Sequence, residues 1–375
     1  MNPLRVLYFG TFDRNYSRNR ILINGLRLAG AQVVECNVPL WSGTEDKVSA
    51  ASGRQGLFAV VRRVIKSYVA LVTAYRNLRW DYDVMVLGYA GQIDTFLARV
   101  LTWLARRPLV LDVFMSVYLI SLERGLARQG LLRTLENIAC RLPDKLIIDT
   151  AEYAQWFDAT YHIPASRFCL VPTGADDSIF KPMPPRPPDG LFRVVFYGTF
   201  IPLHGVQCII QAAELLQNHK AIYWELIGQG PTRKSAEEWA RNHGLTQVVF
   251  TDWIDKDKLP FHASQADILL GVFGSTEQSK RTIQNKIYEA LALARPIITG
   301  DSPTVRSSLR HREYAYLIER ENPAALAQAI LDLQANPGLR DHIAREGHRI
   351  FLGEFTVKRI GERMYQCLQE TAHPS

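Results

Sequence analysis

The chain contains no run of about 18 consecutive apolar residues, the length that a single membrane-crossing helix requires. Its first residues, up to Gly10, are expected to form a strand that enters a turn, and no apolar stretch there is long enough for a signal peptide. Cysteine is scarce: the five cysteines are scattered and form no Cys-x-x-Cys pair. We therefore expect reduced, mostly buried cysteines and a cytosolic protein.

Recognisable motifs for metal or nucleic-acid binding are also lacking. The Asp-x-Asp spacing occurs at 81–83 and at 255–257, but the first leads into a strand and the second precedes a helix, so turn chemistry explains both. We expect no bound metal and no nucleic-acid partner. The net charge of +7 favours anionic partners such as nucleotides or an acidic membrane surface.

The chain does contain a repeated alternation of short apolar runs and segments with helical periodicity. It extends from Arg5 to about residue 172 and restarts at Arg193. Strands that alternate with helices predict a parallel, doubly wound α/β sheet. A chain of 375 residues is long enough for two such domains.

Residues 181–190 separate the two halves and contain five prolines. Proline suits neither a helix interior nor a central strand, so this stretch is interpreted as a stiff interdomain linker. A surface loop inside one domain is the alternative. The predicted division is an N-terminal domain over 1–181, a linker over 182–190, a C-terminal domain over 191–355 and a final helix over 356–375.

Five motifs of the second half occur in a familiar order and spacing. They are Phe196–Gly205, Leu226–Pro231, Val249–Ile254, Ala266–Leu270 and Asn285–Ile298. Together they resemble the nucleotide-sugar domain of retaining GT-B glycosyltransferases of family 4. The first half is similar to the same family more loosely, through Gly10–Phe12, Tyr16–Asn19 and Val171–Phe180.

The resemblance implies a GT-B fold, with two Rossmann-like, doubly wound domains facing a cleft and a final helix that crosses back to the first domain. It implies a hexosyltransferase that works with retention of configuration and without a metal or other cofactor. The co-substrate would be a nucleotide-diphosphate sugar, and the acceptor, a polysaccharide or lipid-linked precursor of the cell envelope, is not specified by the sequence.

The resemblance places the donor on the helix predicted over 282–294. Glu289 corresponds to the family's ribose-binding glutamate, and a carboxylate suits a vicinal diol. The family has another glutamate eight residues earlier, the first of its E-x7-E motif, and here Arg281 stands in its place; Arg281 is expected either to contact the donor and act in catalysis or to be solvated. Thr282, Ile283 and Gln284 would begin the helix and cradle the diphosphate. The glycines usual there are missing, so Asn285 and Lys286 are expected to supply side-chain donors instead.

The remaining donor contacts are expected from three turns. Gly10, Gly198, Gly205 and Gly228 are expected to allow tight turns and close approach of the donor. In the family, cations usually stand at the positions of Thr199 and His204, and a histidine there neutralises phosphate only when it is protonated. Gln229 lies in the turn beneath the nucleotide. Trp253 and Ile254 fall where the family packs the base, with a core tryptophan as the alternative.

Candidates for acceptor binding and catalysis come from the first half. Tyr16, Arg18 and Asn19 open a predicted helix and are expected to contact the acceptor. The family's histidine after the strand at Leu109 is absent, and Asp112, Ser116 and Tyr118 stand near its place. Asp112 and Ser116 are the catalytic candidates and Tyr118 is an acceptor candidate. The leaving phosphate can itself accept the acceptor's proton in such enzymes, so a separate base is not required.

Residues 51–80 contain six basic and no acidic residues, interleaved with apolar ones at helical spacing. This amphipathic pattern suits peripheral binding to an anionic membrane surface on the cytoplasmic side. An ordinary packed helix with a solvated basic face is the alternative.

Two other functions fit parts of the pattern. The departures at Arg281, Thr199 and His204 also suit a non-catalytic subunit that binds a nucleotide sugar on the same fold. An epimerase of related fold would need several charged groups around the sugar, and these are not found.

Overall fold

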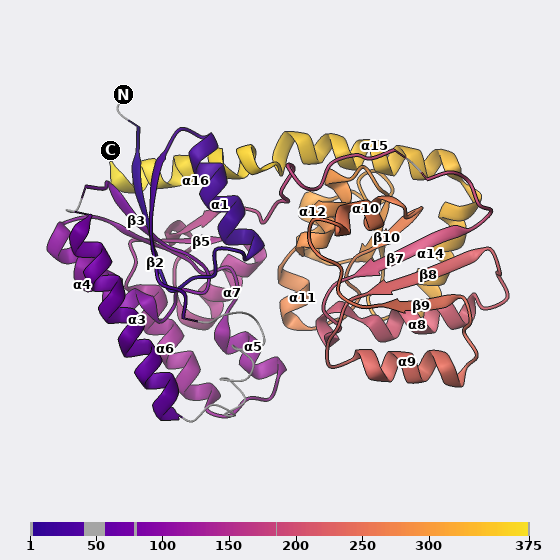
Figure 1. Cartoon of the computed structure of the whole chain (residues 1–375), viewed down its shortest axis with the longest axis horizontal. Helices are drawn as coiled ribbons and strands as arrows, with labels where there is room; N and C mark the ends of the chain where they lie inside the picture. The colour runs from indigo at the N-terminus through magenta and orange to yellow at the C-terminus, as the bar shows by residue number, and fades with distance from the viewer. Residues whose placement is uncertain (1–2, 41–56, 79–80, 185, 374–375) are drawn as a thin grey trace. The chain divides into compact units, whose positions relative to one another are not determined.

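The computed structural model describes residues 3–40, 57–78, 81–184 and 186–373 (Figure 1). The chain divides into two compact units. Unit 1 contains Met1–Pro172 and Val357–Ser375, and unit 2 contains Thr173–Thr356. Each unit is built on one parallel six-stranded sheet, so the α/β class predicted from the alternation is confirmed.

The sheet of unit 1 has the strand order β2-β1-β3-β4-β5-β6. Its strands are β1 (Arg5–Gly10), β2 (Gln32–Asn37), β3 (Val84–Leu87), β4 (Leu109–Asp112), β5 (Lys145–Ile148) and β6 (Phe168–Leu170). The chain winds outwards in opposite directions from β1 and β3, so the strand order reverses between them. Ligands of doubly wound sheets bind beyond the carboxyl ends of the strands at such a point.

Helices cover both faces of this sheet because successive strand residues point to opposite sides. Leu7 and Phe9 of β1 pack into one core, with α3, α4, α6 and α7, whereas Val6 and Tyr8 pack into the other, with α1 and α16. The helices of unit 1 are α1 (Ser17–Leu28), α3 (Leu57–Asn77), α4 (Asp94–Ala105), α5 (Val117–Glu123), α6 (Gln129–Arg141), α7 (Ala151–Tyr161) and α16 (Val357–Ala372).

The final helix α16 follows unit 2 in sequence but packs in unit 1, beside α1 (Figure 1). The two helices touch at glycines: a Cβ added to Gly361 would lie 2.0 Å from the carbonyl oxygen of Gly25. Any larger side chain would therefore separate the helices at this crossing.

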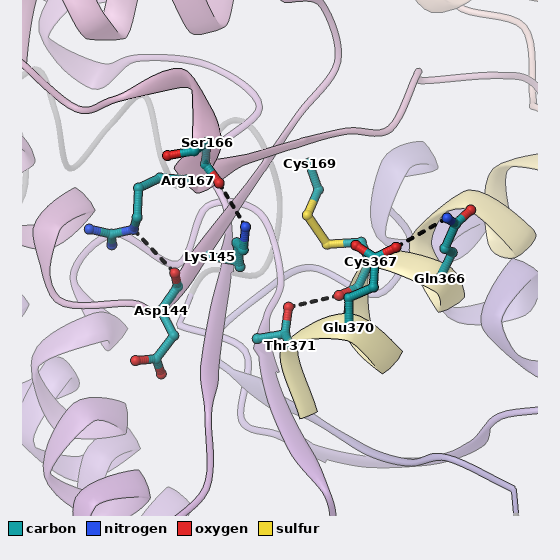
Figure 2. Close-up of a disulfide and its surroundings, with 9 residues drawn as sticks. All are labelled: Asp144, Lys145, Ser166, Arg167, Cys169, Gln366, Cys367, Glu370 and Thr371. Carbon is teal, nitrogen blue, oxygen red and sulfur yellow. Dashed lines mark hydrogen bonds between the residues drawn. A yellow bond between two sulfur atoms is a disulfide. The ribbon is translucent and has the colours of Figure 1, made fainter. Parts of the chain in front are cut away.

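A disulfide joins α16 to the sheet of the same unit. Cys367 of α16 is bonded to Cys169 of β6 (Figure 2). The expectation that all five cysteines are reduced is therefore wrong for this pair. The two residues are 198 positions apart, so no local spacing indicates that the fold brings them together. Cys36, Cys140 and Cys208 are free and buried.

The sheet of unit 2 has the order β12-β11-β10-β7-β8-β9, which reverses between β7 and β10. Its strands are β7 (Phe192–Tyr197), β8 (Ile222–Ile227), β9 (Val248–Thr251), β10 (Ile268–Leu270), β11 (Ile297–Gly300) and β12 (Tyr316–Ile318). Its helices are α8 (Val206–Leu215), α9 (Arg233–Asn242), α10 (Leu259–Ser264), α11 (Glu277–Arg281), α12 (Asn285–Ala292), α13 (Pro303–Ser308), α14 (Pro323–Ala335) and α15 (Pro337–Glu354).

The predicted start of one helix, at residue 282, is wrong. A separate short helix, α11, precedes this residue, and the Thr276 side chain caps it by accepting a hydrogen bond from the Ser279 amide. Thr282 is extended, and α12 begins only at Asn285. The range 282–294, predicted as one helix, therefore begins with an extended connection over 282–284, and its helix covers only Asn285–Ala292.

The proline-rich stretch lies within unit 2 by the division of the chain, which falls between Pro172 and Thr173. Phe180, directly before it, is buried in a core of unit 2. Arg186 donates to the carboxylate of Asp267 at 2.9 Å and to the carbonyl of Gln265 at 3.3 Å. These contacts fasten the stretch to unit 2.

Candidate functional site

The glycine turns of unit 2 gather at the carboxyl end of its sheet, next to the reversal point. Gly198 follows β7 with φ +142°, and Gly228 follows β8 with φ +131°. A Cβ on Gly228 would lie 2.1 Å from the Gly198 carbonyl oxygen, and one on Gly205 would lie 2.5 Å from the amide nitrogen of Gly274. Only glycine permits these backbone approaches, so the turns form one compact surface.

Lys286 of α12 points its ammonium group at this surface. Its Nζ is buried and has no hydrogen-bond partner in the described part of the chain. It lies 4.0 Å from the centre of the Phe196 ring and next to Gly198, where an added Cβ would approach it to 2.8 Å. Burial lowers the pKa of Lys286 to about 7. An unpartnered buried ammonium is costly, and a bound anion would relieve that cost.

Glu289 lies one helical turn after Lys286, on the same side of α12. The hydroxyl of Tyr197, at the end of β7, donates to Glu289 Oε2 at 2.9 Å. Burial and the neighbouring carboxylate raise the pKa of Tyr197 well above its usual value, so it stays a donor. Glu289 is only partly buried, which leaves it accessible to a ligand.

His204 does not supply a second cation here. Its Nδ1 bonds to the carbonyl oxygen of Thr199, which can only accept, so Nδ1 carries a proton. Burial and the nearby Lys286 lower the pKa of His204 well below its usual value. The ring is therefore neutral, and its Nε2 is an acceptor. Of these two residues, Lys286 is therefore the one that can carry a positive charge at this loop.

The connection between α11 and α12 carries the other residues predicted for the diphosphate. Ile283 and Thr282 are buried, and Gln284 Nε2 donates to Thr282 Oγ1 at 3.0 Å. Arg281, the last residue of α11, makes an ion pair with Glu277 and donates to its backbone carbonyl at 2.8 Å. Asn285 is the first residue of α12 and is partly buried.

Trp253 and Ile254 follow β9 on the same edge of the sheet. Trp253 is 57% exposed, so the alternative of a core tryptophan is excluded. Sequence reasoning missed Arg233, whose Nη1 donates to the Gly228 carbonyl at 2.6 Å and to Asp252 Oδ1 at 2.7 Å. Gln229 donates to the same carboxylate oxygen at 2.7 Å. Arg233 therefore ties the glycine turn to the loop that presents Trp253.

In unit 1, Gly10 ends β1 beside the carboxylate of Asp94, the first residue of α4. The Thr11 amide donates to Asp94 Oδ2 at 2.6 Å, and a Cβ on Gly10 would lie 2.6 Å from the same oxygen. Nothing in the sequence around Asp94 indicates that its carboxylate, at the start of α4, contacts Thr11. The Gly10 turn is thus held by a carboxylate rather than left open to an anion.

Asp112 and Arg18 form a fully buried ion pair, with Arg18 Nε 2.8 Å from Asp112 Oδ2. Arg18 also donates to the carbonyl of Val171 at 3.2 Å, and its guanidinium lies 4.7 Å from the centre of the Phe114 ring. These groups satisfy each other inside unit 1. Neither residue exposes surface to a substrate, contrary to the roles expected for them in catalysis and acceptor binding.

Ser116 is likewise buried. It caps α5, and its Oγ donates to Glu136 Oε2 at 2.5 Å. Glu136 also accepts from Tyr161 Oη at 2.7 Å. Ser116 therefore belongs to a buried hydrogen-bond network and is not accessible as a nucleophile. Tyr118, in the same helix, is partly buried.

Asn19 and Tyr16 organise the loop after β3. Asn19 is buried, donates to the Tyr89 carbonyl at 2.6 Å and accepts from the Tyr89 amide at 2.9 Å. The ring of Tyr16 packs on that of Tyr89 at 5.1 Å between centroids. Tyr16 is partly exposed, whereas Asn19 is buried and cannot contact an acceptor.

Sequence reasoning also missed Asp149, which follows β5. Its carboxylate is buried and makes no well-formed hydrogen bond with the described residues. The nearby Arg18 is already bonded to Asp112. Burial raises the pKa of Asp149 to about 7. No local motif indicates a buried carboxyl here.

The basic segment 51–80 corresponds in part to α3, while 51–56 and 79–80 lie outside the described residues. On α3, Arg62 and Lys66 are exposed, together with Ile65 and Val69. None of the helices in the described ranges is long and apolar enough to cross a membrane.

The Asp-x-Asp at 81–83 is a structural element. Asp83 accepts from the Arg5 amide at 2.9 Å and from its guanidinium at 3.0 Å. Within the residues that the structure covers, no cluster of three or more His, Cys, Asp or Glu side chains is arranged to hold a metal ion.

Comparison with known proteins identifies the domain that carries this site. Residues 192–336 match the family described as Glycosyl transferases group 1. This range contains the Gly198 turn, Lys286 and Glu289.

Two curated relatives are glycosyltransferases. A lipopolysaccharide core biosynthesis glycosyltransferase, LpsE of Rhizobium meliloti, is 26% identical over 47% of this chain and 49% of its own. A D-inositol 3-phosphate glycosyltransferase of Acidothermus cellulolyticus is 25% identical over 54% of this chain and 48% of its own. The matches thus span about half the length of these relatives.

Solved structures are similar over nearly the whole chain. Anabaena HepE, solved with UDP and glucose, matches with a TM-score of 0.70 and 17% identity over 98% of this chain and 99% of its own. Sucrose-phosphate synthase from Thermosynechococcus elongatus matches with a TM-score of 0.73 and 15% identity over 99% of both chains. At these identities the likeness concerns the fold, and it confirms the predicted two-domain GT-B architecture.

Proposed function

Because unit 2 carries a glycosyl transferases group 1 domain, we propose that this protein transfers a sugar from a nucleotide-diphosphate donor to an acceptor. The observation that carries the proposal is the buried ammonium of Lys286 facing the Gly198 turn, one helical turn before Glu289. A cation without a partner, beside closely packed glycine turns at the reversal point of the sheet, suits a diphosphate.

In the proposed complex each part of the donor meets one part of unit 2. Glu289 accepts hydrogen bonds from the ribose diol, held in orientation by Tyr197. Lys286 and the amides at the start of α12 bind the diphosphate. The exposed ring of Trp253, on the loop that Arg233 braces, stacks on the base.

The proposed reaction proceeds with retention of configuration and without a metal. As the bond to the diphosphate breaks, negative charge develops on the leaving oxygen, and the Lys286 ammonium stabilises it. The departing phosphate takes the proton of the acceptor hydroxyl, since Asp112 is committed to Arg18 inside unit 1. Catalysis then consists of positioning and charge stabilisation.

The acceptor is proposed to bind unit 1 and to be a precursor of a cell-envelope polysaccharide. The names of the curated relatives, which include lipopolysaccharide core biosynthesis, support this class. The exposed basic residues of α3 support the proposal that the protein binds an anionic membrane surface, on the cytoplasmic side of that membrane.

Calorimetric titration of the full chain with UDP-glucose and a GDP-hexose tests donor binding, followed by transfer assays in EDTA. Glu289→Gln is expected to weaken donor affinity about 10- to 100-fold, because bonds to a charged acceptor are lost. Glu238→Gln, an exposed change on α9, is the matched control. Absence of binding by any nucleotide sugar would refute the proposal.

A second candidate function is a donor-binding subunit without transferase activity. It is favoured by the neutral His204 and by Arg281, which is engaged with Glu277. Saturable donor binding without sugar transfer or donor hydrolysis would support this candidate over the first.

A further inference from the structure

Unit 1 contains a cavity of about 470 Å³ beyond the carboxyl ends of β1 and β3. These strands flank the reversal point of the sheet, where doubly wound folds bind ligands. The volume lies in the range of small-molecule pockets. Its lining includes Gln92, Ile93, Asp94, Phe96, Leu135 and Glu136.

The charged and amide side chains of this lining are already engaged. Asp94 accepts from the amide and hydroxyl of Thr11. Glu136 accepts from Ser116 and Tyr161. Gln92 Nε2 donates to the Met115 carbonyl at 3.2 Å. A sugar ring needs several hydrogen-bonding partners, and the engaged side chains offer it few, whereas the aliphatic and aromatic side chains suit an apolar group.

The rim of the cavity is apolar as well. Ile93 is 63% exposed and Leu135 is 44% exposed, and Phe96 and Val117 are also exposed. Further along α4, the apolar side chains of Val100 and Trp103 are also exposed. An apolar chain can therefore enter the cavity without crossing a polar barrier.

We propose that this cavity binds the apolar chain of an amphiphilic acceptor, so that the acceptor class is a sugar or phosphate head group on an acyl or prenyl chain. The inference rests on the proposed function, because it assigns the acceptor to unit 1. It follows from three observations: the place at the reversal point, the apolar lining and the apolar rim. The cavity holds the chain and leaves the head group outside it.

The test compares amphiphiles that share one head group. Decyl maltoside, octyl maltoside and maltose are titrated into the full chain below their micelle-forming concentrations, with no donor present. Each buried methylene contributes about fourfold in affinity, so decyl maltoside is expected to bind on the order of tenfold more tightly than octyl maltoside. Maltose is expected not to bind measurably.

Two leucines of α6 provide matched variants. Leu135 lines the cavity, whereas Leu131 is similarly exposed but does not line it. Leu135→Trp fills the entrance and is expected to weaken decyl maltoside binding at least tenfold, while Leu131→Trp leaves it within twofold. Leu135→Ser and Leu131→Ser repeat the comparison by removing apolar surface. Far-ultraviolet circular dichroism and thermal unfolding of the full chain report that each variant is folded.

Four outcomes would overturn the proposal: no saturable binding of decyl maltoside, equal binding of maltose, equal effects at Leu131 and Leu135, or loss of binding in Trp103→Ser rather than in Leu135→Trp. The last would place the amphiphile on the exposed face of α4. Since no donor is present, failure here is separate from failure of donor binding or transfer.

Discussion

The side-chain nitrogen of Lys286 occupies the space beside Gly198, where an added methyl group would approach it to 2.8 Å. Gly198→Ala would therefore displace the ammonium and would also place alanine at φ +142°, which side chains rarely adopt. We expect at least a tenfold loss of UDP-glucose affinity, measured by calorimetry.

Gly244→Ala separates the two causes. Gly244 also has a positive φ, +62°, but nothing lies within 4 Å of an added Cβ. This control is expected to lose some stability and to keep donor affinity. Equal donor affinity in both variants would show that donor binding does not require the space that the Lys286 ammonium occupies beside Gly198.

Donor binding is expected to depend on pH through Lys286. Its pKa in the folded protein is about 7, lowered from 10.5 by burial, so the protonated fraction falls between pH 6 and pH 8. In the proposed complex the ammonium form binds the diphosphate, so affinity for UDP-glucose should fall about tenfold over that range. The diphosphate diester of UDP-glucose does not titrate there, so the change reports the protein.

Lys286→Met should bind weakly and with little pH dependence. The same group affects stability with a defined sign. Between pH 7 and 10.5 the unfolded chain holds a proton that the folded chain lacks, so this contribution to stability rises with pH. A Lys286→Met variant that keeps the full pH profile of binding would assign that profile to a group other than Lys286.

The carboxyl group of Asp149, in unit 1, contributes to the pH dependence of stability with the opposite sign to Lys286. Its pKa is raised from 3.8 to about 7 by burial, so the unfolded chain loses the proton first and stability falls as pH rises through this window. Asp149→Asn should therefore stabilise the protein at pH 8, by on the order of 4 kcal/mol, and little at pH 4.

Denaturant titration at both pH values measures this difference. Asp158→Asn, an exposed change on α7, is the control and should have no comparable effect. A destabilising Asp149→Asn at pH 8 would show that the carboxylate has a partner that the asparagine cannot replace.

The residues of the candidate site in unit 2 could largely be located from the sequence because their signal is local. Glycine turns directly follow apolar strands at Gly198 and Gly228, and Lys286 and Glu289 share one short helix. What the sequence did not reveal is how charge is distributed among these residues. The neutral state of His204 depends on a bond to Thr199 and on burial by the whole unit.

The roles in unit 1 were predicted less well because they depend on long-range pairs. Asp112 and Arg18 are far apart in sequence, yet the sheet buries them together. The side chains of Ser116 and Glu136 meet in the same way. A polar residue at the end of a strand suggests an open site, and only the tertiary structure shows that its partner lies beneath the surface.

The disulfide between Cys169 and Cys367 fastens α16 to β6 (Figure 2). It restricts the unfolded chain, so breaking it should destabilise unit 1 by about 2–4 kcal/mol. Because the bridged segment includes all of unit 2, which is compact by itself, the effect should lie toward the lower end. Hydrogen exchange of α16, with and without reductant, measures the loss locally.

Cys367→Ala supplies the control for this measurement. In the variant, α16 should exchange as fast as in the reduced protein, and reductant should change nothing further. Cys208→Ala, at a free buried cysteine of unit 2, should leave exchange in α16 and its response to reductant unchanged. If reductant leaves α16 fully protected in the unmodified chain, then the packing of α16 on α1 at Gly25 and Gly361 holds the helix without the bridge.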